Sequence, residues 1–161
     1  MPTPAINKQI RNASLGFNTI HAAQVVPTVA LSPQTIFTVS GGAILVVSLV
    51  GKVTTVMSAT AYTLAVGLTP AEGAGSSAPS ALASASSSLA SLEVGTMVCL
   101  GATAGAALVP GVNASTVLLK PAPIAVSPGN ISLTGSATQT GALKWYLTWI
   151  PLDDAANVVA V

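Results

Sequence analysis

The chain has 161 residues, of which 51% are hydrophobic and 6% are charged, and its formal net charge is +1. About 25% of the residues of a typical soluble domain are charged, so here Ser, Thr, Ala and Gly must cover most of the surface. This composition is typical of an assembly subunit whose surface is covered by neighbouring protein. The low net charge argues against a nucleic-acid partner, which usually requires a clustered basic face.

A membrane protein is the main alternative for a chain with so little charge. A helix that spans a bilayer needs roughly 20 predominantly apolar residues. The most apolar stretch, residues 43–56, is interrupted by five small or polar residues: Ser48, Gly51, Lys52, Thr54 and Thr55. The first residues also lack the apolar segment of a signal peptide. We therefore expect no membrane partner, and a buried pair of strands at residues 43–56.

Residues 1–33 are predicted to form an extended N-terminal arm. Four prolines punctuate this segment, at positions 2, 4, 27 and 33. Proline favours extended or turn backbone, because it fixes φ and lacks an N–H donor. The segment is nevertheless too apolar for a solvated tail, so we expect Ile10, Phe17 and Ile20 to contact a neighbouring subunit. A flexible tail is the alternative.

Residues 34–161 are predicted to form a single β domain. Segments rich in β-branched residues alternate with Gly and Pro turns at intervals of about 8–12 residues, which is typical of a sandwich or barrel. The segments are 36–39, 43–50, 52–56, 62–68, 96–100, 106–109, 116–119, 124–126, 130–134 and 142–150. No βαβ unit of about 30 residues is indicated by the sequence. The predicted fold class is therefore all-β: a β-sandwich, jelly-roll-like or barrel domain.

Residues 71–91 are rich in Ala and Ser and interrupt the alternation of predicted strands and turns. The first part, residues 71–79, is predicted to be a loop. From Ser80 onward the pattern fits either a strand or a short helix. A helix would place Leu82, Ala85, Leu89 and Leu92 on one face. Both interpretations stay open at this point.

Residues that could carry catalysis are scarce. His21 is the only histidine and lies in the predicted arm, and Cys99 is the only cysteine. Because Cys99 lies within an apolar segment, we expect it to be a small buried hydrophobe. No glycine pattern matches a phosphate-binding loop. The chain is therefore predicted not to be an enzyme, with no catalytic residue, no cofactor and no metal site.

Asp153 and Asp154 form the only acidic pair in the sequence. Two carboxylates could bind Ca²⁺ together with backbone carbonyls, but two acids alone make a weak site. A solvated turn, or an Asp that caps backbone amides, is the favoured interpretation. A further hypothesis is an ion pair from one Asp to Lys144, or to Lys120 of a neighbouring subunit.

Three aromatic residues lie close together near the end of the sequence: Trp145, Tyr146 and Trp149. In a strand, alternation places the two tryptophans on one face and the tyrosine on the other. This pattern favours a stripe in the core or at a subunit contact, and a stacking platform for a ligand is the alternative. The predicted partner contacts outside the arm are Trp145, Trp149, Asp153 and Asp154.

Two segments, 34–56 and 141–161, resemble the opening and closing strands of small structural proteins encoded in the head gene clusters of tailed bacteriophages. In the first segment the matching residues are Phe37, Gly41, Gly42, Leu49, Gly51, Thr54 and Thr55. In the second they are Gly141, Lys144, Trp145, Leu147, Pro151, Leu152, Asp153, Asp154 and Val158. The family pattern has glycine where this chain has Ala155, a difference that affects the final turn. The two segments cover about a quarter of the chain.

The resemblance implies a virion structural protein of the capsid decoration (cement) type. Such a protein lies on the outer surface of the capsid, commonly as a homotrimer, and binds the major capsid protein. It stabilises the assembled shell by the free energy of binding. The alternatives are a structural protein of the phage tail, neck or fibre, or a carbohydrate- or cell-surface-binding β module that uses Trp145, Tyr146 and Trp149.

Overall fold

The computed structural model describes residues 17–20, 24–25, 31–71, 80–103, 105–111 and 123–161. Every regular element in these residues is a β-strand. The strands are β1 (Phe17–Ile20), β2 (Gln24–Val25), β3 (Gln34–Ser40), β4 (Ile44–Thr55), β5 (Leu64–Pro70), β6 (Ser80–Ala83), β7 (Met97–Cys99), β8 (Val109–Pro110), β9 (Ile124–Val126), β10 (Gly129–Gly135), β11 (Ala142–Pro151) and β12 (Asn157–Ala160). The predicted all-β class is therefore confirmed for the part of the chain that the structure describes.

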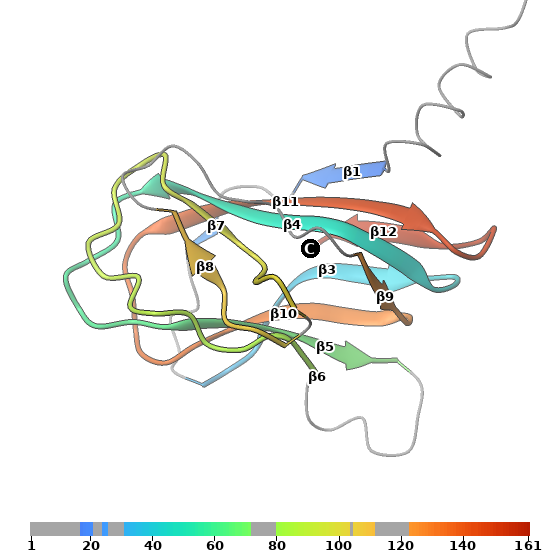
Figure 1. Ribbon diagram of the computed structural model, residues 1–161, viewed down its shortest axis with the longest axis horizontal. Helices are drawn as coiled ribbons and strands as arrows, with labels where there is room; N and C mark the ends of the chain where they lie inside the picture. Colours follow the sequence, from blue (N-terminus) through green and yellow to red (C-terminus); the bar gives the residue numbers. More distant parts are fainter. Residues whose placement is uncertain (1–16, 21–23, 26–30, 72–79, 104, 112–122) are drawn as a thin grey trace, which may run out of the picture.

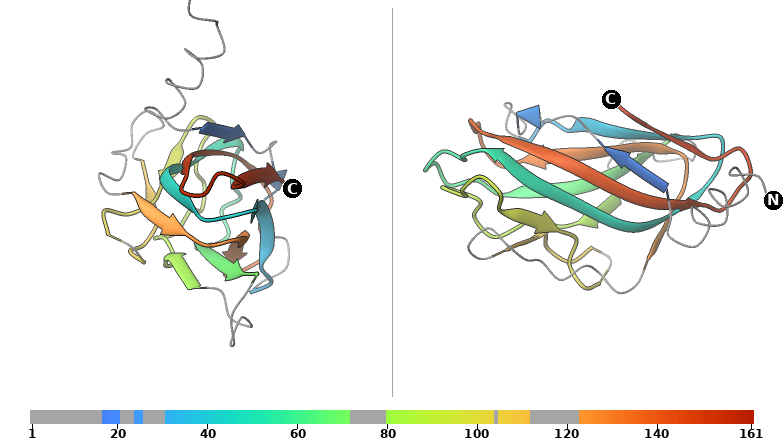
Figure 2. Two further views of the ribbon diagram at one scale, coloured as in Figure 1. Left: turned by 90° about the vertical axis from the view of Figure 1, so that its right-hand side faces the viewer. Right: turned by 90° about the horizontal axis from the view of Figure 1, so that it is seen from above.

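The strands form two antiparallel sheets that enclose a common core, as in a β-sandwich (Figure 1; Figure 2, left). The larger sheet has the order β1-β11-β4-β7-β8, with β2 also paired to β11 and β9 to β4. The smaller sheet has the order β12-β3-β10-β5-β6. Apolar side chains from both sheets form one continuous hydrophobic cluster. Of the predicted architectures, the sandwich is therefore the one observed.

Two pairs of consecutive strands, β3 with β4 and β11 with β12, build the centre of this sandwich. The connections β3–β4 and β11–β12 each carry the chain from one sheet to the other. β11 pairs with β4 along its whole length in the larger sheet, and β12 pairs with β3 in the smaller sheet. The two segments that carry the family resemblance are therefore neighbours in both sheets, although they are far apart in the sequence.

A bulge in β4 determines which of its residues face the core. The pairing with β11 skips Val47, so one extra residue is inserted there. Before the bulge Ile44 and Val46 are buried, whereas after it Leu49 is buried and Lys52 is only half-buried. Side chains alternate between the two faces of a strand, so without this extra residue Lys52 would point toward the core. The bulge thus places Lys52 on the outer face of the larger sheet.

The sequence around Gly51 predicts strands that are either split or bulged there. The split is wrong, and the bulges in the pairing with β11 lie at Val47 and Thr54. The segments 43–50 and 52–56 belong to one strand, and Gly51 lies within it. Its role is to leave room for a neighbour: a Cβ atom at Gly51 would lie 3.0 Å from two ring carbons of Trp145. The strand predicted at 116–119 lies outside the described residues.

The Ala/Ser-rich segment from Ser80 onward forms β6 and then an extended cover over the core, not the short helix. Ala83, Ser86 and Leu89 are buried, whereas Ala85 is exposed. Ser86 binds the backbone of Leu64 through two hydrogen bonds: its N–H donates to the carbonyl at 2.9 Å, and its Oγ accepts from the N–H at 3.1 Å. The helix alternative is therefore wrong, because this segment bonds to the edge of β5 and not to itself.

Part of the predicted arm adds a strand to the larger sheet. β1 pairs with β11 in antiparallel orientation, from Phe17 opposite Trp149 to Ile20 opposite Tyr146. β2 continues this pairing toward the other end of β11, and β1 also lies beside β12 of the smaller sheet. The described part of the arm therefore lies on its own chain. Most of residues 1–33 lie outside the described residues.

Candidate assembly surfaces

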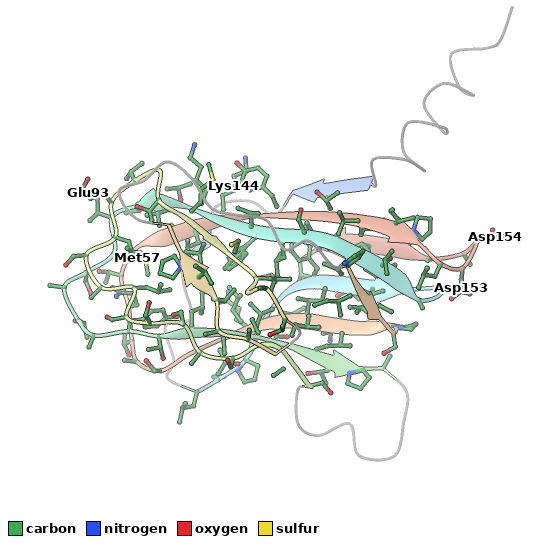
Figure 3. All side chains as sticks on the ribbon, viewed as in Figure 1. Met57, Glu93, Lys144, Asp153 and Asp154 are labelled. Atoms are coloured by element: carbon green, nitrogen blue, oxygen red, sulfur yellow. The ribbon has the colours of Figure 1, made fainter. Side chains whose placement is uncertain are left out.

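At one end of the sandwich the β11–β12 turn packs against the β3–β4 turn (Figures 1 and 3). The Asp153 carboxylate accepts a hydrogen bond from the Ala43 N–H at 2.6 Å, and the Leu152 N–H donates to the Ala43 carbonyl at 3.0 Å. Gly42 leaves the space for this contact, because a Cβ atom there would lie 2.8 Å from Asp153 Oδ2. The interpretation of the acidic pair as a cap on backbone amides is therefore confirmed for Asp153.

The tip of this turn, which we call the acidic turn, consists of Leu152, Asp153 and Asp154. All three residues are exposed, and the side chain of Leu152 is 53% exposed. Within the described residues, Asp154 forms no ion pair. The acidic turn therefore offers a carboxylate and an apolar side chain to a partner. Its predicted contact with a partner stays a prediction.

On the outer face of the larger sheet lie two lysines, which we call the lysine pair. Lys52 of β4 stands directly opposite Lys144 of β11, and both are half-buried. Their neighbours on this face are apolar or aromatic: Met97 lies opposite Lys52 on β7, and Tyr146 follows Lys144 on β11. Lys144 Nζ lies 5.8 Å from the centroid of the Tyr146 ring, within the range of a cation–π contact.

The predicted ion pair between the acidic turn and Lys144 is wrong within one chain. Figure 3 shows Lys144 toward one end of the sandwich, and Asp153 and Asp154 at the other. The strand between Lys144 and Pro151 alone spans about 23 Å, at roughly 3.3 Å per residue. The other hypothetical partner, Lys120, lies outside the described residues.

Trp145 and Trp149 belong to the core of the sandwich. Trp145 is 0% exposed and Trp149 is 6% exposed, and they share the inward face of β11 as the alternation predicts. Their prediction as partner contacts is therefore corrected, because the folded chain offers neither indole to a partner. The same burial removes both rings from a stacking platform for a carbohydrate.

The predicted arm contacts can be placed only in part. Phe17 and Ile20 are the first and last residues of β1, and Ile10 lies outside the described residues. β1 forms the edge of the larger sheet beyond β11. A contact between this edge and a neighbouring subunit stays a prediction.

The residues considered for chemistry do not form a reactive site in the described part of the chain. Cys99 is buried in β7 opposite Val50, as expected for a small buried hydrophobe. Burial raises the pKa of the Cys99 thiol, which disfavours the nucleophilic thiolate. His21 lies outside the described residues, and among those described no three His, Cys, Asp or Glu residues group as metal ligands would. The absence of enzymatic activity stays a prediction.

Known proteins give no further guide to these surfaces. Comparison with protein-family models, with curated proteins and with solved structures found no match. The resemblance of residues 34–56 and 141–161 to phage head proteins therefore stands on the residues quoted for it. No helix in the described ranges is long and apolar enough to cross a membrane.

The sequence did not reveal the lysine pair. The alternation around Trp145 places Lys144 outward, but the orientation of Lys52 depends on the bulge at Val47. No residue type in β4 signals that bulge. The sequence also gave no indication of Gln139, which is 1% exposed and whose Oε1 accepts hydrogen bonds from the N–H groups of Ser58 and Thr140 at 2.9 and 2.8 Å.

Proposed function

We propose that this protein is a capsid decoration (cement) protein of a tailed bacteriophage. It binds the major capsid protein on the outer surface of the virion as a homo-oligomer, with a trimer favoured, and it stabilises the assembled shell. It acts as a structural protein and not as an enzyme.

The observation that carries this proposal is the scarcity of charge on an apolar exterior. The described residues include five charged side chains, Lys52, Glu93, Lys144, Asp153 and Asp154. Seven large apolar side chains of the same residues are between 49% and 74% exposed: Leu31, Val56, Val94, Val109, Leu152, Val159 and Val161. A free soluble domain normally mixes charges of both signs over its surface, whereas charged residues are depleted where subunits meet. This exterior therefore favours an assembly subunit.

The two segments that carry the resemblance lie against each other in the fold, which supports the proposal. Gly42 and Asp153 are both matching residues, and they lie against each other where the β3–β4 and β11–β12 connections meet. The departure at Ala155 is compatible with the same turn. Its φ is not positive, unlike that of Leu31 and Ser91 among the described residues, so the turn does not require glycine there.

The proposed mechanism needs no reactive group. A protein that binds the assembled shell, but not its dissociated subunits, stabilises the shell by the free energy of binding. Repetition of the contact over many equivalent positions makes modest individual contacts collectively strong. The exposed apolar side chains and the sparse charges suit this kind of contact.

The proposal is tested by adding the purified protein to phage shells that lack it. We expect saturable co-sedimentation at a copy number proportional to that of the major capsid protein, and a higher temperature of shell dissociation. A buffer-only sample and free major capsid protein are the controls. A copy number far below that of the shell protein, with binding confined to one vertex, would favour the tail, neck or fibre alternative. No binding to shells would refute the proposal.

A further inference from the structure

The lysine pair places two like charges directly opposite each other on neighbouring strands. Residues opposite each other in an antiparallel pair have Cβ atoms about 5 Å apart, and like charges in that arrangement destabilise the sheet. Lys52 and Lys144 are two of only five lysine and arginine residues in the chain. In the described ranges neither lysine forms an ion pair. Among the residues that the structure describes, the lysine pair therefore has no counter-ion.

The surroundings of the lysine pair suit a carboxylate that arrives with an apolar side chain. Met97, Val50 and Tyr146 lie on the same outer face, next to the two lysines, and all three are half-buried. An ion pair on a partly apolar surface is screened less by salt than a fully exposed pair. The face thus offers two ammonium groups beside an apolar area.

The acidic turn at the other end of the same chain has the complementary composition. Asp154 is exposed and forms no ion pair with a described residue, and Leu152 beside it is 53% exposed. Asp153 uses one carboxylate oxygen to bind Ala43, which holds the turn in a defined conformation. The acidic turn therefore presents a carboxylate and an apolar side chain on a fixed support.

The two complementary surfaces cannot meet within one chain. They lie toward opposite ends of the sandwich (Figure 3), with about 23 Å of strand between Lys144 and Pro151. A contact between them must join two copies, head to tail. Such a heterologous contact repeats from copy to copy, and it closes into a ring when the rotation between copies allows.

We infer that the lysine pair is the docking site for the acidic turn of a second copy of this chain. Asp154 of one copy binds Lys52 and Lys144 of the next, and Leu152 packs on the apolar area around Tyr146. The inference rests on the homo-oligomer in the proposed function and names the surfaces through which its copies meet. Charge complementarity within one sequence favours a second copy over a foreign acidic protein.

The test uses the full chain, purified, without capsid shells. Sedimentation velocity at increasing protein concentration reports the association, and circular dichroism confirms that each variant is folded. We expect wild-type chains to associate, and to associate less at high salt. The variant Lys52→Glu/Lys144→Glu and the variant Asp154→Lys should each lose association by at least tenfold. The control Lys52→Arg/Lys144→Arg, which keeps the charge, should associate as the wild type does.

Mixing the two charge-reversed variants gives the decisive measurement. The acidic turn of the first variant can dock on the intact lysine pair of the second, so the mixture should associate although neither variant does so alone. The inference is overturned if wild-type chains stay monomeric, if the reversed variants associate normally, or if the mixture fails to associate. If the glutamate variant does not fold, Lys52→Gln/Lys144→Gln replaces it, with loss of association again expected. Because no shell is present, these outcomes are separate from failure of shell binding.

Discussion

The carboxylate of Asp153 accepts a hydrogen bond from the backbone N–H of Ala43, 110 residues earlier in the chain, at 2.6 Å. Ala43 lies between β3 and β4, and Asp153 lies between β11 and β12. Each of these connections passes from one sheet to the other, so this bond joins two of the connections that link the sheets. It also fixes the acidic turn that we assign to contacts between copies.

Replacing Asp153 by alanine should destabilise the fold. The Ala43 N–H would lose a charged acceptor, and because the site is exposed to water we expect a loss of about 1 kcal/mol in the free energy of unfolding. Urea unfolding followed by tryptophan fluorescence measures this change. Asp154→Ala is the matched control and should change stability by less than about 0.5 kcal/mol. Equal effects of the two substitutions would contradict the capping role of Asp153.

Ser86→Ala tests whether the Ala/Ser-rich segment is part of the core. Ser86 Oγ accepts a hydrogen bond from the buried Leu64 N–H, and its loss leaves that donor without an acceptor. An unsatisfied buried donor costs about 1–3 kcal/mol. The neighbouring exposed Ser87→Ala should have almost no effect on urea unfolding. A neutral result for Ser86→Ala would show that the segment does not pack on β5 in solution.

The burial of the Tyr62 hydroxyl predicts that the protein loses stability at alkaline pH. Its hydroxyl is buried against Gly135, without a hydrogen-bond partner in the described structure, and burial raises the pKa of Tyr62. Above pH 10, the ordinary tyrosine pKa, the unfolded chain releases this proton and the folded chain retains it. The contribution of protonated Tyr62 to the free energy of unfolding is therefore complete below about pH 10. It decreases as the pH rises further, by up to about 1.4 kcal/mol per pH unit.

Tyr62→Phe is the control for this pH dependence. The substitution removes an unpaired hydroxyl, so its effect at neutral pH should be small. Chemical unfolding measured between pH 7 and about pH 11 should show a smaller alkaline loss for this variant than for the wild type. Identical pH profiles would mean that the Tyr62 hydroxyl reaches solvent in the folded protein.

The two tryptophans provide a direct test of the carbohydrate-binding alternative. Trp145 and Trp149 are the only tryptophans in the chain, and both are buried. We expect emission shifted to the blue and little quenching by iodide in the folded protein, with full quenching after unfolding. Strong quenching of the native protein, together with a spectral change on addition of carbohydrate, would support the binding module instead.

Deleting residues 1–33 should leave a folded β domain that attaches less strongly to shells. Within residues 31–161, the buried apolar side chains that the structure describes begin at Ile36, so this deletion leaves them in place. It removes β1 and β2, and exposes the edge of β11. Circular dichroism and the shell co-sedimentation assay measure the two expected results. Unfolding of the truncated chain would assign the segment to the core and refute the arm prediction.

The sequence was sufficient to predict the β class and the inward face of β11, because these depend on local alternation. It was also sufficient to suggest that Asp153 caps a turn, since the acid follows a Pro–Leu pair next to a strand end. The orientation of Lys52 could not be predicted in this way. It depends on the bulge at Val47, which the pairing with β11 imposes over a long separation in sequence.

The same separation explains why Trp145 and Trp149 were predicted as partner contacts although they lie in the core. A stripe of Trp145 and Trp149 has the same pattern in a core as at a subunit contact. Only the position of β11 between β1 and β4, above the smaller sheet, decides between them. Local periodicity identifies the face of a strand but not what covers that face.

The pairing of β4 with β11 and of β3 with β12 also has a consequence for how the chain acquires its structure. β3 also pairs with β10, and β4 with β7 and β9, but their pairing is complete only when β11 and β12 are present. The Ala43–Asp153 bond closes a loop of 110 residues. Folds dominated by such distant pairings form slowly, in milliseconds to seconds. During synthesis the apolar faces of the early strands therefore stay partly exposed to solvent until β11 and β12 have been made. Productive assembly is consequently restricted to chains whose β11–β12 segment has been made.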